Sequence, residues 1–227
     1  MALLVTAATP QELYAALPAL QGGAVPEHKV LCVPHSPVLA CLTGVGPVNA
    51  GIALGAALQD ARVHAVCNVG LAGSFHLRRL PLRSLVLVTE EIFPEYGMNT
   101  GRSVHASALG FAQWQHEGKA IYDRLPLACA LEQLALPAHL PRAASLTVAG
   151  VSASPARARA LHKSYGAGLE NMEGFAVALA CAQRGKACME IRCVSNKVGA
   201  QHAALRDFSG ALAAMRAALP ALFAACC

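Results

Sequence analysis

Residues 168–182 of this chain read Gly168-Leu-Glu-Asn-Met-Glu-Gly-Phe-Ala-Val-Ala-Leu-Ala-Cys-Ala182, and residues 189–199 read Met189-Glu-Ile-Arg-Cys-Val-Ser-Asn-Lys-Val-Gly199. The first segment predicts a helix that begins on polar residues and continues through the apolar run Phe175–Ala182. The second predicts a buried strand that ends on polar residues. Glu173 lies at the start of the helix, where the helix dipole stabilises a carboxylate by about 0.3–1 kcal/mol. This position alone predicts a structural role for Glu173.

Polar side chains interrupt the apolar strand at the end of this stretch. Side chains alternate between the two faces of a strand, so one face is expected to carry Glu190, Arg192, Val194 and Asn196. Three polar residues on one face of a buried strand need partners or a ligand. Asn196 stands where the strand ends, and α/β sheets bind their ligands at strand ends. The stretch therefore indicates a polar site beside Asn196.

The composition favours one well-buried α/β domain over residues 1–227. The 227 residues are 55% hydrophobic, 14% charged and 5% aromatic, so the core must consist mainly of Ala, Leu and Val. No linker, low-complexity tract or internal repeat divides the sequence. Such an apolar chain exposes surface that a subunit interface can cover, and we expect a homo-oligomer.

Charge and cysteine content exclude several classes of protein. The net charge is +5, but the basic residues are scattered apart from a short cluster at Arg78, Arg79 and Arg83, so no nucleic-acid partner is expected. The nine cysteines show no Cys-x-x-Cys pair and no metal-ligand spacing, which predicts a reducing cytoplasm and no metal site. We recognise no signal peptide and no apolar run of the roughly 18–20 residues that span a membrane. We expect a cytoplasmic protein without a membrane partner.

The first predicted strand and helix meet at a corner that contains Glu12. Ala2–Ala8 predicts a buried strand, and Thr9-Pro-Gln-Glu12 is a capping box with Pro at the first helical position. This pattern gives Glu12 a structural role as a helix cap. The corner also lies at the carboxyl end of a strand, where α/β sheets place their chemistry. Both interpretations of Glu12 stay open at this point.

Two further strand ends carry small residues. The segment Thr43–Gly51 follows a short strand, and its glycines, Gly46 among them, allow a ligand to approach the backbone and the helix N–H groups. A strand over Val63–Val69 closes on a turn at Gly70–Ser74. We find no dinucleotide fingerprint with its acidic residue about 20 positions on, and no cofactor is expected.

The remaining segments complete an alternation of strands and helices. Further strands are predicted over Leu85–Val88 and Ser145–Val151, and a helix capped by Ser154 follows the second of them. Residues 98–141 predict loop and helix with weak periodicity, and Leu205–Phe223 predicts a closing helix. The alternation favours a three-layer α/β/α fold with a mixed, mostly parallel central sheet.

Four motifs occur in one order along the chain. They are Thr43-Gly-Val-Gly46, Asn68-Val-Gly-Leu-Ala-Gly73, Glu170-Asn-Met-Glu-Gly174 and Arg192-Cys-Val-Ser-Asn196. Together they resemble, over roughly residues 3–220, the superfamily of nucleoside phosphorylases and nucleosidases. Within it, the Glu170–Gly174 motif followed by Ser195-Asn-x-Val-Gly199 most resembles the futalosine hydrolases, a family of menaquinone-pathway enzymes. The resemblance implies an enzyme that hydrolyses a nucleoside N-glycosidic bond without a cofactor.

The resemblance implies four catalytic residues. Glu173 would bind the ribose hydroxyls, and Asn196 would face N7 of the purine. Glu12 would lie beside the attacking water, with Arg192 near it. These residue types suit the chemistry, because cleavage of the bond builds positive charge on the ribose and negative charge on the departing base. A carboxylate that takes the proton of a positioned water contributes about 10²–10⁴-fold to a rate.

Further residues would contact the substrate. By resemblance, residues 151–152 would border the base, residues 72–73 would supply backbone beside the sugar, Met172 would lie against the ribose, and Phe208 would close over the pocket. Besides Glu173 and Asn196, the predicted substrate contacts are Gly46, Ala72, Gly73, Val151, Ser152, Met172 and Phe208.

Two positions depart from the adenosine-type nucleosidases of the superfamily. Leu71 stands where they carry a hydroxyl residue, so a contact to water there must come from the main chain. Asn196 stands where they carry Asp. An amide can hydrogen-bond N7 and O6 but cannot deliver a full proton, which suits a 6-oxopurine such as hypoxanthine better than adenine. An amide can also pair with N6 and N7 of adenine, so its shape alone does not exclude adenine.

The resulting prediction is a hydrolase that releases hypoxanthine from futalosine or a close 6-oxopurine nucleoside. Adenine-releasing nucleosidases of the aminodeoxyfutalosine or methylthioadenosine type are the first alternative. A purine nucleoside phosphorylase is the second, disfavoured because the segments around Glu12 and Gly70–Ser74 lack phosphate-binding arginines. A non-catalytic nucleoside-binding protein is the third, but it would not need Glu12, Glu173 and Asn196 together.

Overall fold

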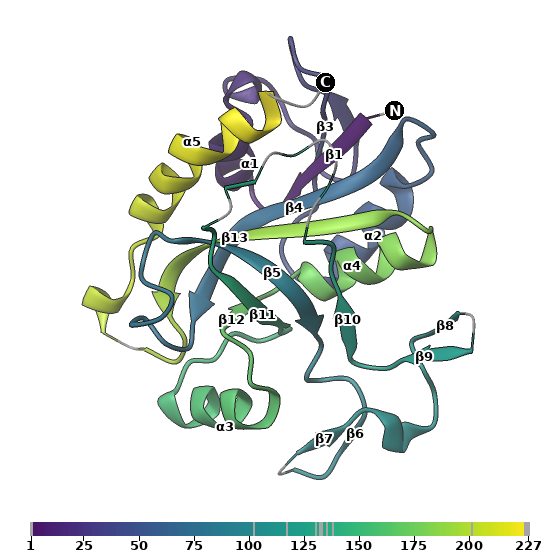
Figure 1. Cartoon of the computed structure of the whole chain (residues 1–227), viewed down its shortest axis with the longest axis vertical. Helices are drawn as coiled ribbons and strands as arrows, with labels where there is room; N and C mark the ends of the chain where they lie inside the picture. The colour runs from purple at the N-terminus through teal and green to yellow at the C-terminus, as the bar shows by residue number, and fades with distance from the viewer. Residues whose placement is uncertain are drawn as a thin grey trace.

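Two layers of helices enclose a central sheet, which confirms the predicted α/β/α architecture (Figure 1). The computed structural model describes residues 2–101, 103–116, 118–129, 131, 134, 136, 137, 139–200 and 202–224. On one face lie α1 (Pro10–Ala16) and α5 (Phe208–Ala224). On the other lie α2 (Pro47–Ala57) and α4 (Gly174–Gln183), while α3 (Pro155–Tyr165) covers one end.

Nine strands of the described chain form the central sheet. In spatial order eight of them are β10 (Arg124–Pro126), β5 (Leu85–Ile92), β11 (Arg142–Thr147), β12 (Leu169–Asn171), β4 (Val63–Ser74), β1 (Ala2–Ala7), β3 (Leu39–Leu42) and β2 (Val30–Cys32). The ninth, β13 (Ala187–Lys197), pairs with both β4 and β5, so β4, β12, β11, β5 and β13 close a ring. Parallel pairings join β1 to β3 and β4, β11 to β5 and β12, and β13 to β4. The other pairings are antiparallel, so the sheet is mixed as predicted.

Alternating side chains of β1 reach both helix layers. Leu3 and Val5 pack into the core formed with α1 and α5, and Leu4 packs into the core formed with α2 and α4. Because both faces of the sheet are covered, any polar side chain inside it needs a partner within the protein or from a ligand.

Among the described residues, no helix combines the length and the apolar character that crossing a bilayer requires. The described 3-10 helices are η1 (Pro18–Leu20), η2 (Ser107–Leu109) and η3 (Ala203–Leu205).

β4 continues to Ser74, so the prediction of a turn at Gly70–Ser74 is wrong. Glycine inside a strand marks the close approach of another group. A Cβ built on Gly70 would lie 2.6 Å from Arg192 Nη1 and 2.9 Å from Glu12 Oε1. The small residues of β4 therefore make room for side chains from β13 and α1 rather than turning the chain.

Residues 98–141 form short strands where the sequence predicted loop and helix. β6 (Met98–Asn99) pairs with β7 (Val104–His105), and β8 (Trp114–His116) pairs with β9 (Lys119–Ile121). β10 then joins the central sheet beside β5. The described part of this segment contains no α-helix. Strands of two or three residues are too short to produce a recognisable hydrophobic period.

Candidate active site

A cavity of about 540 Å³ opens where β4, β12 and β13 end and where α4 and α5 begin. It brings together most of the predicted site residues from distant parts of the chain. Its walls include Glu12, Ala72, Gly73, Val151, Ser152, Met172, Glu173, Asn196 and Phe208. Two predicted residues, Gly46 and Arg192, are not part of the wall and contact Glu173 instead. The predicted set therefore converges on one pocket and its immediate support.

Glu12 is both a helix cap and a wall of the pocket. Thr9 donates to Glu12 Oε2 from its backbone N–H (2.9 Å) and from its hydroxyl (2.7 Å), which completes the predicted capping box. The other oxygen, Oε1, accepts the backbone N–H of Leu71 at 2.8 Å. The carboxylate is buried. The helix cap thus fixes one oxygen of Glu12, while the other meets β4 at the cavity, so the two interpretations of Glu12 are compatible.

Glu173 precedes α4 but does not cap that helix with its side chain. Its Oε1 accepts the N–H of Gly46 at 3.0 Å, and its Oε2 lies 3.5 Å from Arg192 Nη1. Gly46 has a φ of +94°, a left-handed conformation that glycine adopts readily. Burial raises the pKa of the Glu173 carboxyl, although Arg192 and the Gly46 N–H oppose that rise, while the neighbouring Glu12 adds to it. Glu173 is therefore held in place with part of its acceptor capacity left for a ligand.

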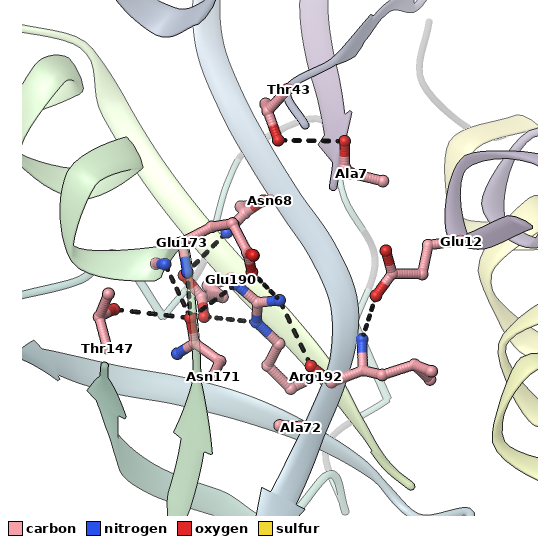
Figure 2. Close-up of polar contacts among 12 residues, drawn as sticks. Ala7, Glu12, Thr43, Asn68, Ala72, Thr147, Asn171, Glu173, Glu190 and Arg192 are labelled. Atoms are coloured by element: carbon pink, nitrogen blue, oxygen red, sulfur yellow. Dashed lines mark hydrogen bonds and ion pairs between the residues drawn. The ribbon is translucent and has the colours of Figure 1, made fainter. Parts of the chain in front are cut away.

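Arg192 lies behind the pocket and organises several groups there (Figure 2). Its Nε donates to Glu190 Oε1 at 2.7 Å, and its Nη2 donates to Asn171 Oδ1 at 3.2 Å. Its Nη1 lies 3.5 Å from the carbonyl oxygen of Leu71, the residue whose N–H contacts Glu12. Burial by itself lowers the pKa of the guanidinium, but Glu190 and Glu173 outweigh burial and raise it. Arg192 therefore contacts Glu173 directly and is linked to Glu12 through Leu71 of β4.

Asn171 provides the cap of α4, a role that the sequence analysis missed. Its Oδ1 accepts the N–H groups of Glu173 and Gly174, both at 2.8 Å. Its Nδ2 donates to Glu91 at 2.6 Å and to the Ser145 hydroxyl at 2.7 Å. An Asn three residues before a helix start is a recognisable capping signal, so the sequence did carry this information. Asn171 fixes the backbone from which Glu173 projects.

Glu91 is a second buried group that the sequence analysis did not single out. Thr147 donates its hydroxyl to Glu91 Oε2 at 2.6 Å and accepts the Phe175 N–H at 2.7 Å. Burial raises the pKa of Glu91 well above its ordinary value, and the adjacent Glu190 raises it further. A Cβ on Gly174 would lie 2.6 Å from Glu190 Oε2, so glycine is needed where these carboxyls meet α4. Burial and the charge of Glu190 therefore both favour the protonated form of Glu91.

The opposite wall of the pocket carries Asn196, and its strand position differs from the predicted one. Val194 pairs with Ala72 and Asn196 pairs with Gly73, because a bulge at Ser195 shifts the register of β13. Ala72 and Gly73 are consecutive, so their side-chain directions are opposite. The bulge therefore places Asn196 on the face opposite to Val194, and the prediction of a shared face is wrong for this residue.

Hydrogen bonds orient the Asn196 amide and a neighbouring carboxylate. The Ser195 hydroxyl donates to Asn196 Oδ1 at 2.9 Å, which leaves Nδ2 as the amide's donor, with a long 3.3 Å contact to the Lys197 carbonyl. Glu170, a buried wall residue that the sequence analysis assigned no role, accepts the Ser152 N–H at 2.9 Å and the Ser152 hydroxyl at 2.6 Å. We call Glu12, Glu173 and Arg192 the Glu173 side, and Ser152, Glu170 and Asn196 the Asn196 side.

Apolar residues complete the cavity. Met172 lines its wall between Asn171 and Glu173, and Val151 and Phe208 are exposed wall residues, 61% and 52% accessible. Within the described chain, no group of three or more His, Cys, Asp and Glu side chains is arranged to hold a metal ion. The wall offers the carboxylates of Glu12, Glu170 and Glu173, the amide of Asn196, the cations of Lys197 and Arg206, and backbone N–H groups, with the Arg192 guanidinium buried behind it.

Comparison with known proteins places the chain in a family. The sequence model of the phosphorylase superfamily matches residues 3–226. The futalosine hydrolase of Thermus thermophilus is 36% identical over 183 residues, which cover 80% of this chain and 79% of that protein. Both matches cover most of the chain, and this extent is sufficient to show family membership.

Solved structures share the architecture. The 5′-methylthioadenosine/S-adenosyl homocysteine nucleosidase of Campylobacter jejuni matches with a TM-score of 0.78 at 18% identity and covers 100% of this chain and 98% of that one. The futalosine hydrolase of Helicobacter pylori matches with a TM-score of 0.70 at 16% identity and covers 97% of each chain. At such identities the likeness shows the fold.

Proposed function

This chain belongs to the phosphorylase superfamily, and on that premise we propose that its pocket hydrolyses the N-glycosidic bond of futalosine and releases hypoxanthine. The chain is an N-glycosyl hydrolase, as its extensive match to a futalosine hydrolase indicates. The observation that carries the proposal is the meeting of Glu12, Glu173 and Asn196 in one cavity. These groups can supply a base, a stabiliser of positive charge and a hydrogen-bond donor at three points around one nucleoside.

We infer that Glu173 binds the ribose hydroxyls. As the bond from C1′ to N9 breaks, its electron pair leaves with the purine and positive charge develops on the ribose. A buried carboxylate beside the hydroxyls stabilises that charge strongly, because the surrounding dielectric is low. Gly46 and Arg192 hold Glu173 in place, and Met172 packs nearby at the wall. Glu173 must be ionised for this role, so the upward shift of its pKa by burial narrows the pH range of activity on the acid side.

We assign the activation of water to Glu12. Water attacks C1′, its oxygen forms the new bond, and its proton passes to Glu12. The Leu71 N–H fixes Glu12 Oε1 at the pocket, while the capping box fixes Oε2. Water rather than phosphate is the proposed acceptor, because the described arginines at the pocket already have partners. Arg192 donates to Glu190 and Asn171, and Arg206 donates to the Ala200 carbonyl.

The departing base is proposed to lie on the Asn196 side. The Asn196 amide donates to N7 or O6 and thereby stabilises the purine anion, which takes its proton from solvent. Val151 and Ser152 border the base, Ala72 and Gly73 provide backbone beside the sugar, and Phe208 covers the opening. An amide cannot deliver a proton, so the site suits a base whose anion is delocalised onto O6.

We also propose that the catalytic unit is one domain over residues 1–227 and acts as a cytoplasmic homo-oligomer in menaquinone biosynthesis. The outer face of α2 supports the oligomer. Val48 and Ile52 on this helix are 73% and 56% exposed, and Val45 beside them is 50% exposed and lines the pocket. Large apolar side chains gathered at a pocket opening favour coverage by another subunit.

Incubation of the protein with futalosine in ¹⁸O-labelled water tests the proposed reaction. Hypoxanthine and a reducing sugar with one ¹⁸O atom at C1′ are expected, at a rate that does not change with added phosphate. Recovery of a sugar 1-phosphate would identify a phosphorylase, and release of adenine alone from a nucleoside panel would identify the adenine-type alternative. Binding without any release would identify a nucleoside-binding protein.

A further inference from the structure

Glu170 is a buried carboxylate in the wall of the pocket, and its hydrogen-bond donors are neutral. It is 6% exposed and lines the cavity. Ser152 provides both of its hydrogen bonds, from the N–H and the hydroxyl. None of the described lysines, arginines or histidines forms an ion pair with it. A carboxylate offers about four acceptor positions, so Glu170 retains acceptor capacity that a donor from a ligand can fill.

Strand pairing places Glu170 opposite Asn196 across a single glycine. Gly73 of β4 pairs with Glu170 of β12 and with Asn196 of β13. Directly paired residues point to the same face, and neighbouring strands are about 4.8 Å apart, so the two Cα atoms are separated by roughly 10 Å. A Cβ on Gly73 would lie 3.0 Å from Asn196 Nδ2. The missing side chain thus leaves space between the carboxylate and the amide.

The two side chains match one edge of a 6-oxopurine. That edge presents N7 and O6 as acceptors, followed by N1–H as a donor. Asn196 Nδ2 supplies the donor for N7 and O6, and Glu170 supplies the acceptor for N1–H. Adenine presents a donor at N6 and a lone pair at N1, so its N1 would face the Glu170 oxygens without a proton between them.

We propose that Glu170 selects 6-oxopurines by accepting the N1–H of the bound base. This inference rests on the proposed function and extends it from the leaving group to the choice of substrate. A buried acceptor that meets a lone pair loses both its solvation and its hydrogen bond. Sites that hydrogen-bond a substrate N–H reject analogues lacking it by about 10⁴–10⁵-fold at best. Glu170 therefore acts on specificity, while Glu12 and Glu173 act on the bond.

Glu170→Gln tests the proposal, with Glu95→Gln as a matched control. Glu95 also accepts a backbone N–H from the same loop, that of Ala149 at 2.8 Å, but it pairs with Arg157 and is not a wall of the cavity. The ratio of kcat/KM for futalosine to kcat/KM for its 6-amino counterpart is measured. We expect Glu170→Gln to lower this ratio at least about tenfold, mainly through loss on futalosine. Glu95→Gln should keep the wild-type ratio.

Binding of free bases to the wild-type protein provides a test that needs neither turnover nor a folded variant. Calorimetry should show hypoxanthine binding at least about tenfold more tightly than adenine and than N1-methylhypoxanthine, which lacks the N1 proton. Equal binding of hypoxanthine and its N1-methyl derivative, or no binding of any base, would overturn the role of Glu170. Turnover of futalosine without dependence on N1 would leave the proposed function intact and remove this inference. If base binding depends on the N1 proton but futalosine is not hydrolysed, the recognition role of Glu170 stands and the proposed hydrolysis is wrong.

Discussion

The Glu173 side and the Asn196 side of the pocket differ in how their charges are satisfied. On the Glu173 side, Arg192 contacts Glu173 and Glu190, and Asn171 caps the helix that carries Glu173. On the Asn196 side, Glu170 has hydrogen bonds from Ser152 alone, and no described residue forms an ion pair with it. The protein fixes a buried cation beside the carboxylate of one side, whereas it holds the carboxylate of the other side with neutral donors alone.

This difference separates catalysis from recognition. Groups that stabilise a transition state must already be oriented, because reorganisation during the reaction costs free energy. Groups that choose between ligands need unpaired positions that the correct ligand fills and a wrong one leaves empty. The Glu173 side, whose groups the protein already orients, suits the first task, and the Asn196 side suits the second. Substitutions on the two sides should therefore affect different kinetic quantities.

The largest expected effect is the loss of turnover in Glu12→Gln. The amide cannot take the proton of water, so kcat should fall by about 10²–10⁴-fold while KM for futalosine changes little. Steady-state kinetics check this expectation. Ser154→Ala is the control, because it removes another helix cap, the one that accepts the Arg157 N–H, and should cost about 0.5–2 kcal/mol of stability without loss of turnover. Near-wild-type kcat in a folded Glu12→Gln protein would reduce Glu12 to a helix cap.

Arg192→Lys should weaken the Glu173 side through lost geometry. Lysine keeps one charge but cannot reach Glu190, Asn171 and Glu173 together, as the guanidinium does. We expect kcat to fall at least about tenfold and the free energy of unfolding to fall by about 1–3 kcal/mol. Arg157→Lys, at the more exposed pair with Glu95, should cost at most about 1 kcal/mol. The free energy of unfolding is measured with urea. Similar losses in both variants would show that the buried contacts of Arg192 add no stability beyond that of an exposed ion pair.

Asn196→Asp should change the choice of base rather than the overall chemistry. The new group is an anion that repels N7 and O6, or, if burial raises its pKa, an acid that can protonate N7 of adenine. Both states act against hypoxanthine, so the ratio of kcat/KM for futalosine to that for its 6-amino counterpart should fall at least about tenfold. If a folded mutant keeps the wild-type ratio, Asn196 does not contact the purine edge.

The smallest effect on activity is expected for Glu91→Gln, which replaces the carboxyl group with an amide of the same shape. Turnover at neutral pH should stay within about twofold. Glu91 has a folded-state pKa raised above its ordinary 4.5, so its contribution to stability is complete below that value and is lost as pH rises through the raised pKa. Urea unfolding between pH 5 and 8 should show a shallower decline of stability in the mutant. Parallel declines would mean that Glu91 is ionised in the folded protein.

The sequence could predict those features of the site that depend on local pattern. Thr9 and Glu12 form a capping box readable from four residues, and Glu173 opens an apolar run that is clearly helical. Glu170 could not be assigned from its neighbours, because its role depends on the pairing of β12 with β4. The bulge at Ser195 likewise depends on the register between β13 and β4. Local signals thus located Glu12, Glu173 and Asn196, whereas the position of Glu170 and the register of Asn196 depend on tertiary pairing.

The same reasoning explains where the fold prediction was incomplete. Gly70 and Gly73 were interpreted as a turn because glycine usually marks turns, yet both lie inside β4. Their small size serves the groups that approach them: Arg192 and Glu12 at Gly70, and Asn196 at Gly73. No local pattern distinguishes a glycine that turns the chain from one that makes room for a distant side chain.

A single competition experiment tests most directly the claim that the Asn196 side chooses the base. The wild-type protein is mixed with equal concentrations of futalosine and its 6-amino counterpart, and the initial rates of hypoxanthine and adenine release are measured by chromatography. Their ratio equals the ratio of the two kcat/KM values. We predict hypoxanthine in excess by at least about 100-fold, because both Asn196 and Glu170 favour the 6-oxopurine edge. Equal release of the two bases, or an excess of adenine, would contradict the account.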